Sequence, residues 1–187
     1  MWAVAQNVDI ISMSFGFPRW HNAIREAIQA TPNRVLMFAA ASTGKNAYVP
    51  TFPANEPSVI SIWAADGMGS QPKTNSKAGR FATLGVAVKS AWPERPENPA
   101  MFEARKSGTS YATPIAVGIA ACVLEFARQN DMAKVFYDEL TSHRGMTKVF
   151  QFMEVESKGL HLICPWKLFH KSMRRTSILD TLVTLVN

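Results

Sequence analysis

The residues best suited to chemistry form the segment Gly108-Thr109-Ser110-Tyr111-Ala112-Thr113-Pro114. Proline is tolerated in only about the first turn of a helix, so the apolar segment that follows should be a helix beginning near residues 110–113. The Ser110 hydroxyl would then lie at the positive end of the helix dipole, beside unpaired backbone N–H groups. A serine that forms an acyl-enzyme needs this placement. The same spacing suits Ser110 or Thr109 as a plain N-cap, so both interpretations stay open.

The elements that would position Ser110 alternate between strands and helices. Three short apolar runs carry hydrophobic side chains on both parities, which favours a parallel sheet covered on both faces. The first two runs are separated by a helical pattern, so they predict a right-handed βαβ unit. We expect a three-layer α/β/α fold with a mainly parallel sheet. The expected strands are 8–14, 34–40, 58–64 and a short one within 81–91. The expected helices are 20–30, 114–128, 133–140, 147–152 and 177–186. The expected loops and surface segments are 41–57, 66–80 and 92–101.

Composition excludes several classes of protein. With 187 residues, 47% hydrophobic and 18% charged, the chain suffices for one domain with a real core and is neither a disordered tail nor a coiled coil. The net charge of +6 is modest and no basic stripe interleaved with aromatics accompanies it, so we expect no nucleic-acid partner. The longest apolar run, around 114–124, is too short to span a membrane, so we expect no membrane partner.

The cysteines and acidic residues indicate neither a metal nor a cofactor. Two cysteines form neither a disulfide framework nor a zinc site, and no acidic cluster suggests a cation. No presequence or secretory signal opens the chain; Met1 is followed almost at once by what reads as core, at Trp2–Val4. We therefore expect a fragment or truncated product, with only a weak indication of an intracellular location.

The residues in their order resemble a known family. Residues 108–114, followed by a helix rich in Ala, Val and Gly, resemble the nucleophile motif of the subtilisin-like serine peptidases, the subtilases. Residues 9–16 resemble that family's strand ending in a Ser-Leu-Gly type segment, and residues 35–44 resemble its strand leading into an Ala-Ala-Gly-Asn turn. Residues 52–66 resemble its "Tyr-Pro-Ala … Val-Ile … Gly-Ala" stretch. Residues 130–187 resemble the tails of fungal intracellular subtilases.

The resemblance implies a serine endopeptidase that cuts peptide or protein substrates through an acyl-enzyme on Ser110. The Ser110 backbone N–H would be one oxyanion donor. The resemblance also implies a partial subtilisin-like core at 1–130, which lacks the segments with the catalytic Asp and His. A helical C-terminal extension at 131–187 would pack on this core. The substrate would lie between two walls, Ser14, Phe15 and Gly16 on one side and Ala39, Ala40 and Ala41 on the other.

Two departures from the family pattern weaken this function. Ser42 stands where the family has its oxyanion Asn; losing one such donor typically costs about a hundred- to a thousandfold in turnover, and Asn46 could replace it only after a loop shift. The family orders its triad Asp, His, Ser, and both earlier segments should precede Ser14. Asp9 and His21 have the right order but match no catalytic motif. We therefore expect this chain alone to have little or no activity.

Two other interpretations stay open. The chain could be a degenerate, non-catalytic subtilase scaffold that binds a peptide or a partner, including other domains of a longer parent protein. It could also be an α/β-hydrolase, since residues 108–112 are one residue away from a Gly-x-Ser-x-Gly elbow. That elbow requires an acid and a histidine downstream, and the candidates are Asp131, Asp138, His143, His161 and His170.

Overall fold

The structure is a computed structural model, and it describes residues 2–41, 50–70, 81–92, 103–130 and 136–187. Its centre is a six-stranded sheet in the order β1-β2-β3-β4-β8-β7. The strands are β1 (Ile10–Met13), β2 (Leu36–Ala40), β3 (Val59–Ala65), β4 (Phe81–Leu84), β7 (Glu154–Ser157) and β8 (Leu160–Ile163). All neighbouring pairs are parallel except β7 with β8.

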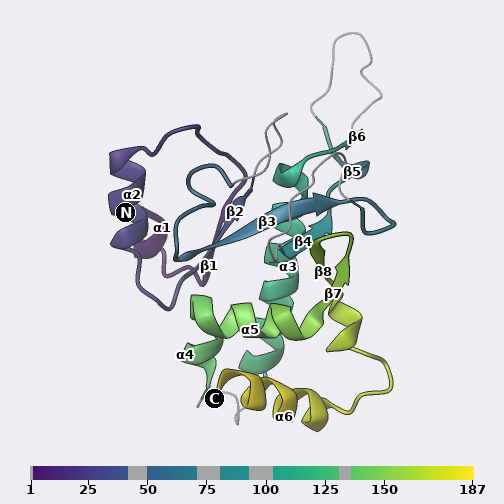
Figure 1. Ribbon diagram of the computed structural model, residues 1–187. Helices are drawn as coiled ribbons and strands as arrows, with labels where there is room; N and C mark the ends of the chain where they lie inside the picture. Colours follow the sequence, from purple (N-terminus) through teal and green to yellow (C-terminus); the bar gives the residue numbers. More distant parts are fainter. Residues whose placement is uncertain (1, 42–49, 71–80, 93–102, 131–135) are drawn as a thin grey trace.

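Helices cover both faces of this sheet (Figure 1). On β2, Leu36 and Phe38 point into the larger core with α3, and Met37 and Ala39 point into a second core beneath α2. This two-sided burial is what the apolar runs predicted, and it confirms the mainly parallel, three-layer α/β fold. The helices are α1 (Trp2–Ala5), α2 (Asn22–Gln29), α3 (Thr109–Arg128), α4 (Tyr137–Leu140), α5 (His143–Met153) and α6 (Arg175–Val186).

The longest helix, α3, has 20 residues and crosses the middle of the sheet. It extends beyond the apolar run 114–124, and by length and composition it would suffice to cross a bilayer. One side of it, including Ala112, Ala116 and Ala120, is fully buried in the larger core. Small side chains let the helix axis approach the sheet closely, as a core helix does.

The N-terminal segment departs from expectation. Trp2, which the sequence suggested as core, is 78% exposed, and α1 buries none of its residues. The reason is position: within the described ranges, β1 pairs only with β2, so the chain ahead of it lies beyond the edge of the sheet. β1 itself is only half-buried for the same reason.

The C-terminal segment adds strands where the sequence predicted helices alone. The hairpin of β7 and β8 turns at Lys158 and Gly159, both with positive φ, and β8 extends the sheet by pairing with β4. Helices α4, α5 and α6 overlap the three predicted helical segments, although 131–135 lie outside the described residues. The division of the chain into a core and a C-terminal extension at residue 130 stays a prediction. Residues from both sides of this position share the larger hydrophobic core.

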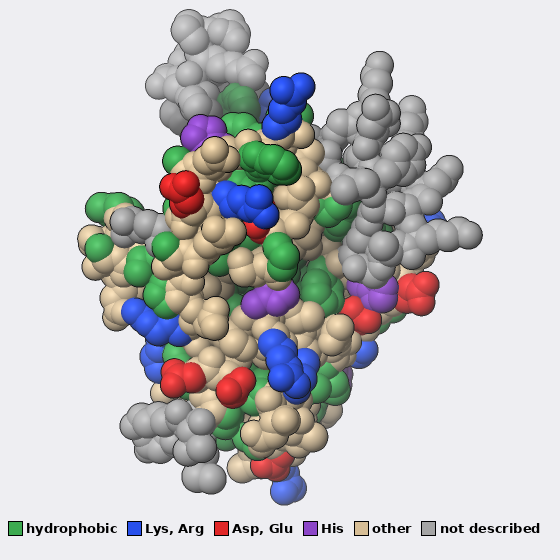
Figure 2. Space-filling model, turned by 60° about the vertical axis from the view of Figure 1, so that its left-hand side comes forward, with side chains coloured by type: hydrophobic (Ala, Val, Ile, Leu, Met, Phe, Trp, Pro, Cys, Tyr) green, Lys and Arg blue, Asp and Glu red, His purple; other side chains and the backbone are tan. Residues whose placement is uncertain are grey.

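Two smaller features complete the fold. The predicted strand within 81–91 is split into β4 and β5 (Val88–Ala91), and β5 forms an antiparallel pair with β6 (Glu103–Lys106). A short 3-10 helix spans Pro165–Lys167. On the face turned forward in Figure 2, acidic and basic side chains are interspersed with hydrophobic ones.

Candidate active site around Ser110

Ser110 is exposed in the first turn of α3. Gly108 precedes the helix with a φ of 151°, a conformation that L side chains rarely adopt, and its N–H donates to Gly85 O at 2.8 Å. Ser110 therefore follows directly on a backbone turn that is anchored to the sheet. Its own N–H belongs to the first turn of the helix, where no helical carbonyl is available to accept it.

Close packing fixes this first turn against the ends of β3 and β4. A Cβ at Gly85 would lie 2.5 Å from Ala64 Cβ and 3.0 Å from Ala112 Cβ, so only glycine fits between the strand and the helix. The buried Thr83 hydroxyl also donates to Ala112 O at 2.7 Å. The nucleophile candidate thus stands on a rigid support, while its hydroxyl stays at the surface.

Pro114 lies deeper in α3 than the sequence indicated. The helix begins at Thr109, so Pro114 is its sixth residue and not part of its first turn. Proline has no N–H, and in an α-helix the N–H of residue 114 would donate to the carbonyl of residue 110. Ser14 fills this place, because its Oγ donates to Ser110 O at 3.0 Å. In return Ser110 Oγ donates to Ser14 O at 3.1 Å.

The two predicted substrate walls lie at the carboxyl ends of β1 and β2. Ser14, Phe15 and Gly16 are exposed just after β1, whereas Ala39, Ala40 and Ala41 are buried at the end of β2. The structure thus brings Ser14 into contact with Ser110, and parallel pairing brings β2 beside β1. Ser42 and Asn46 lie outside the described residues.

Thr51 connects the two walls, and the sequence analysis did not single it out. Its Oγ1 donates to Ala41 O at 3.0 Å and its N–H donates to the same oxygen at 2.9 Å. A Cβ at Gly16 would lie 2.5 Å from Thr51 Oγ1. The adjacent Phe52 O accepts the Phe17 N–H at 2.7 Å. Gly16 was a sequence signal of this close contact, but Thr51 could not be identified as its partner without the fold.

The four histidines of the chain are all described, and none forms a hydrogen bond with Ser110. The His21 ring lies 6.4 Å from the Phe17 ring, His161 pairs with Glu154 at 2.7 Å, and His170 bonds Ser172. His143 contacts the Val59 backbone at the start of β3, the opposite end of the strands. No downstream imidazole therefore packs against Ser110 as an α/β-hydrolase triad would require.

Asp9 also makes no contact with Ser110 among the described residues. Asp9 lies just before β1, whereas Ser14 lies just after this strand. The Asp9 carboxylate accepts a hydrogen bond from Arg128 at 2.8 Å. This bond, together with one to Tyr137, raises the pKa of Arg128, and burial raises the pKa of Tyr137. Asp9 therefore ties the last turn of α3 to the start of β1.

The profile of the Subtilase family matches residues 1–144, well over half of the chain. The chain belongs to the subtilase family. One relative is a subtilisin-like protease, het-Q2, of Podospora anserina, which is 27% identical over an alignment of 192 positions that covers 92% of this chain and 52% of the relative. Subtilisin of Bacillus pumilus is 27% identical over an alignment of 129 positions that covers 66% of this chain and 45% of the relative.

Solved structures confirm the fold of this subtilase. The prenylagaramide maturation protease PagA superposes with a TM-score of 0.68 at 20% identity, covering 100% of this chain and 65% of that one. The PatG macrocyclase in complex with peptide gives a TM-score of 0.52 at 23% identity, covering 68% and 39%. This subtilase spans about half the length of these two curated relatives.

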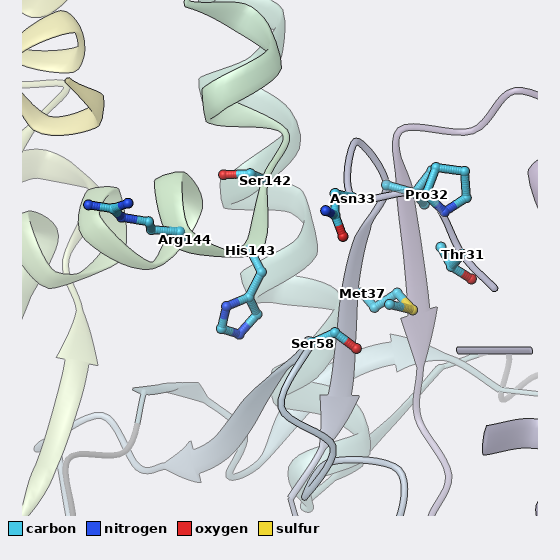
Figure 3. Close-up of a pocket in the computed structure, with 9 residues that line it drawn as sticks. Thr31, Pro32, Asn33, Met37, Ser58, Ser142, His143 and Arg144 are labelled. Atoms are coloured by element: carbon cyan, nitrogen blue, oxygen red, sulfur yellow. The ribbon is translucent and has the colours of Figure 1, made fainter. Parts of the chain in front are cut away.

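A separate cavity lies at the other end of the sheet from Ser110. It has a volume of about 270 Å³ and is bordered by the turn after α2, the starts of β2 and β3, and the start of α5. In Figure 3 the imidazole of His143 points toward Ser58, while Ser142 and Arg144 point away from it. Burial lowers the pKa of His143, and a hydrogen bond with the Val59 backbone opposes that shift. Both effects act on an imidazole that forms part of the cavity wall.

Proposed function

We propose that this chain is the nucleophile-bearing part of a serine endopeptidase, with Ser110 as the residue that forms the acyl-enzyme. The observation that carries the proposal is the exposed Ser110 hydroxyl in the first turn of α3, in contact with the chain that continues from β1. In that position the helix dipole and the first-turn N–H groups favour negative charge on an adjacent oxygen. A peptide carbonyl attacked by Ser110 would develop its charge there.

The reaction requires an imidazole that these 187 residues do not bring to Ser110. Ser110 Oγ would bond to the scissile carbonyl carbon while its proton passes to the imidazole; the C–N bond then breaks as the imidazolium returns that proton to the leaving amine. Water would next cleave the ester by the same proton route. Since the Ser110 hydroxyl donates only to a carbonyl among the described residues, we propose that the chain alone is strongly impaired.

The substrate-binding groups follow from the two walls. Backbone groups of Ser14, Phe15 and Gly16 would pair with an extended peptide, and the small Ala39, Ala40 and Ala41 would border the pocket for the side chain before the cleaved bond. Ser42 would stand in place of the longer oxyanion donor of the family. We propose a peptide or protein substrate, in keeping with the proteases among the relatives.

Chemical rescue tests the proposal. The purified chain is labelled with a fluorophosphonate in increasing concentrations of free imidazole, which supplies a diffusible base. The rate should rise with imidazole in the wild type and stay at background in Ser110→Ala, while Ser12→Ala, which removes another exposed serine, should match the wild type. Ser42→Asn should increase the assisted rate by about a hundredfold. Equal imidazole-dependent rates in wild type and Ser110→Ala would refute Ser110 as the nucleophile.

A non-catalytic scaffold is the second candidate. The reciprocal bonds between Ser14 and Ser110 favour it, because they satisfy the hydroxyl without any base. It predicts that imidazole leaves the labelling of Ser110 unchanged.

A further inference from the structure

A pocket lies between the segment that joins β1 to α2 and the turn that precedes β3. It has a volume of about 400 Å³, which is within the range typical of ligand pockets. Three apolar and three polar or charged residues line it: Pro18, Trp20 and Phe52, with Arg19, Asn55 and Glu56. We call it the Trp20 pocket. No step of the proposed peptide cleavage uses these six residues.

Contacts between its two walls hold the Trp20 pocket open. Phe17 N–H donates to Phe52 O at 2.7 Å, which joins the two segments at one end of the pocket. Arg25 of α2 reaches both walls: its Nε lies 3.4 Å from Glu56 Oε1, and its Cζ lies 5.7 Å from the centre of the Trp20 ring. The walls are therefore fixed relative to each other before any ligand binds.

Trp20 gives the pocket an exposed aromatic surface. Its side chain is 68% exposed, whereas the neighbouring Phe52 is buried. A large apolar side chain left exposed beside a pocket marks a binding surface. Tryptophan and arginine are also the residue types that most often dominate the binding energy of an interface. Since aromatic rings pack favourably on one another, the pocket favours an aromatic group as its ligand.

The free charge of the pocket is positive. The Glu56 side chain is only 11% exposed and is paired with Arg25. Arg19 and Asn55 are exposed, and neither makes a hydrogen bond or ion pair with another residue that the structure describes. A guanidinium matches the geometry of a carboxylate. A carboxamide has both a donor and an acceptor, which match the C=O and N–H of a peptide group.

We propose that the Trp20 pocket binds an aromatic residue with an acidic neighbour in a partner polypeptide. The aromatic ring packs against Trp20 and Pro18, the acidic side chain pairs with Arg19, and the peptide group that joins them bonds to the Asn55 carboxamide. A free aromatic acid would leave Asn55 without a partner, so the three groups together select a polypeptide. This binding goes beyond the proposed function and does not depend on it.

Fluorine NMR of the full chain labelled with 5-fluorotryptophan tests the site. The signal of Trp20 is identified by its loss in Trp20→Phe, and Trp166, which is 61% exposed and lies beside Lys167, is the internal control. Titration with acetyl-Asp-Phe-Asp-amide should shift the Trp20 signal in a saturable manner and leave the Trp166 signal in place. Three further probes lack the ring, the acid or the peptide groups, and each should bind several-fold more weakly: acetyl-Asp-Ala-Asp-amide, acetyl-Lys-Phe-Lys-amide and phenylacetate.

Charge reversal tests the role of Arg19. Arg19→Glu should weaken binding of the acidic peptide about tenfold and strengthen binding of the lysine peptide, because attraction becomes repulsion and the reverse. Arg34→Glu changes another exposed arginine outside the pocket and should leave both affinities as in the wild type. Ser110→Ala should also bind the acidic peptide as the wild type does.

Four results would overturn the proposal. The first is a Trp20 signal that stays in place at millimolar concentrations of the acidic peptide. The second is equal binding of the acidic and the lysine peptides, because the contact would then be apolar alone. The third is binding of phenylacetate as tight as that of the acidic peptide, since a small aromatic acid would then be the ligand. The fourth is loss of binding in Ser110→Ala, which would move the peptide to the candidate active site.

Discussion

Ser14 and Ser110 exchange two hydrogen bonds, although 96 residues separate them: each hydroxyl donates to the other residue's carbonyl oxygen, at 3.0 and 3.1 Å. Pro114 is the reason that one of these bonds is available, since it leaves Ser110 O without its helical donor. The pair joins the end of the edge strand to the start of the helix that carries the candidate nucleophile. It also holds the Ser110 hydroxyl as a donor to a carbonyl, which is no base.

The bond from Ser14 should contribute measurably to stability. Ser14→Ala removes the donor to Ser110 O, and we expect a loss of about 0.5–1 kcal/mol in the free energy of unfolding, because the bond is exposed. Urea unfolding measures this change, and Ser12→Ala, in the strand β1 that leads to Ser14, is the matched control. Pro114→Ala restores an N–H to the helix, so Ser14→Ala should cost less in that background. An equal cost in both backgrounds would show that the proline does not create the need for Ser14.

The contact at Gly85 should tolerate no side chain. Gly85→Ala places a Cβ 2.5 Å from Ala64 Cβ, and we expect about 1–3 kcal/mol of destabilisation as the first turn of α3 shifts. The same shift should slow the imidazole-assisted labelling of Ser110. Gly67→Ala, where the new Cβ meets open space, is the control. Wild-type stability and labelling in Gly85→Ala would contradict the close packing of strand and helix.

His143 should make stability depend on pH. Burial lowers its pKa in the folded chain, so the unfolded chain binds more protons in the window between the folded pKa and the ordinary value of about 6.5. The stabilisation is fully present above that ordinary value and is lost as the pH falls through the folded pKa. Urea unfolding at a series of pH values measures how the free energy of unfolding depends on pH. His143→Asn should flatten this dependence within the window, whereas His170→Asn, at an exposed histidine, should leave it unchanged. A slope equal to that of the wild type in His143→Asn would exclude His143 as its source.

Much of the fold could be predicted from the chain, because buried parallel strands and apolar helices leave periodic signals. The family and the mainly parallel sheet followed from residues 9–66 and 108–125, and both are confirmed. Trp2 was wrong as a core residue, since hydrophobicity does not show that β1 is an edge strand. β7 and β8 were missed because their alternation is short and their place in the sheet depends on pairing with the distant β4.

The candidate site was less accessible to sequence reasoning. Helix-capping rules predicted the start of α3 near Ser110, but the mutual bonds with Ser14 depend on two segments that meet only in the fold. Thr51 was missed for the same reason, since its partners Ala41 and Gly16 lie in two other segments. The catalytic and substrate-binding roles given to Ser110, Ser14 and Ala39–Ala41 stay predictions.

The most direct measurement is the rate of fluorophosphonate labelling of the chain by itself, in buffer without imidazole or added protein, compared with Ser110→Ala. Because the Ser110 hydroxyl has a carbonyl as its acceptor, we expect both proteins to react at the same background rate. Fast labelling of the wild type that disappears in Ser110→Ala would contradict it, because the chain would then contain its own base.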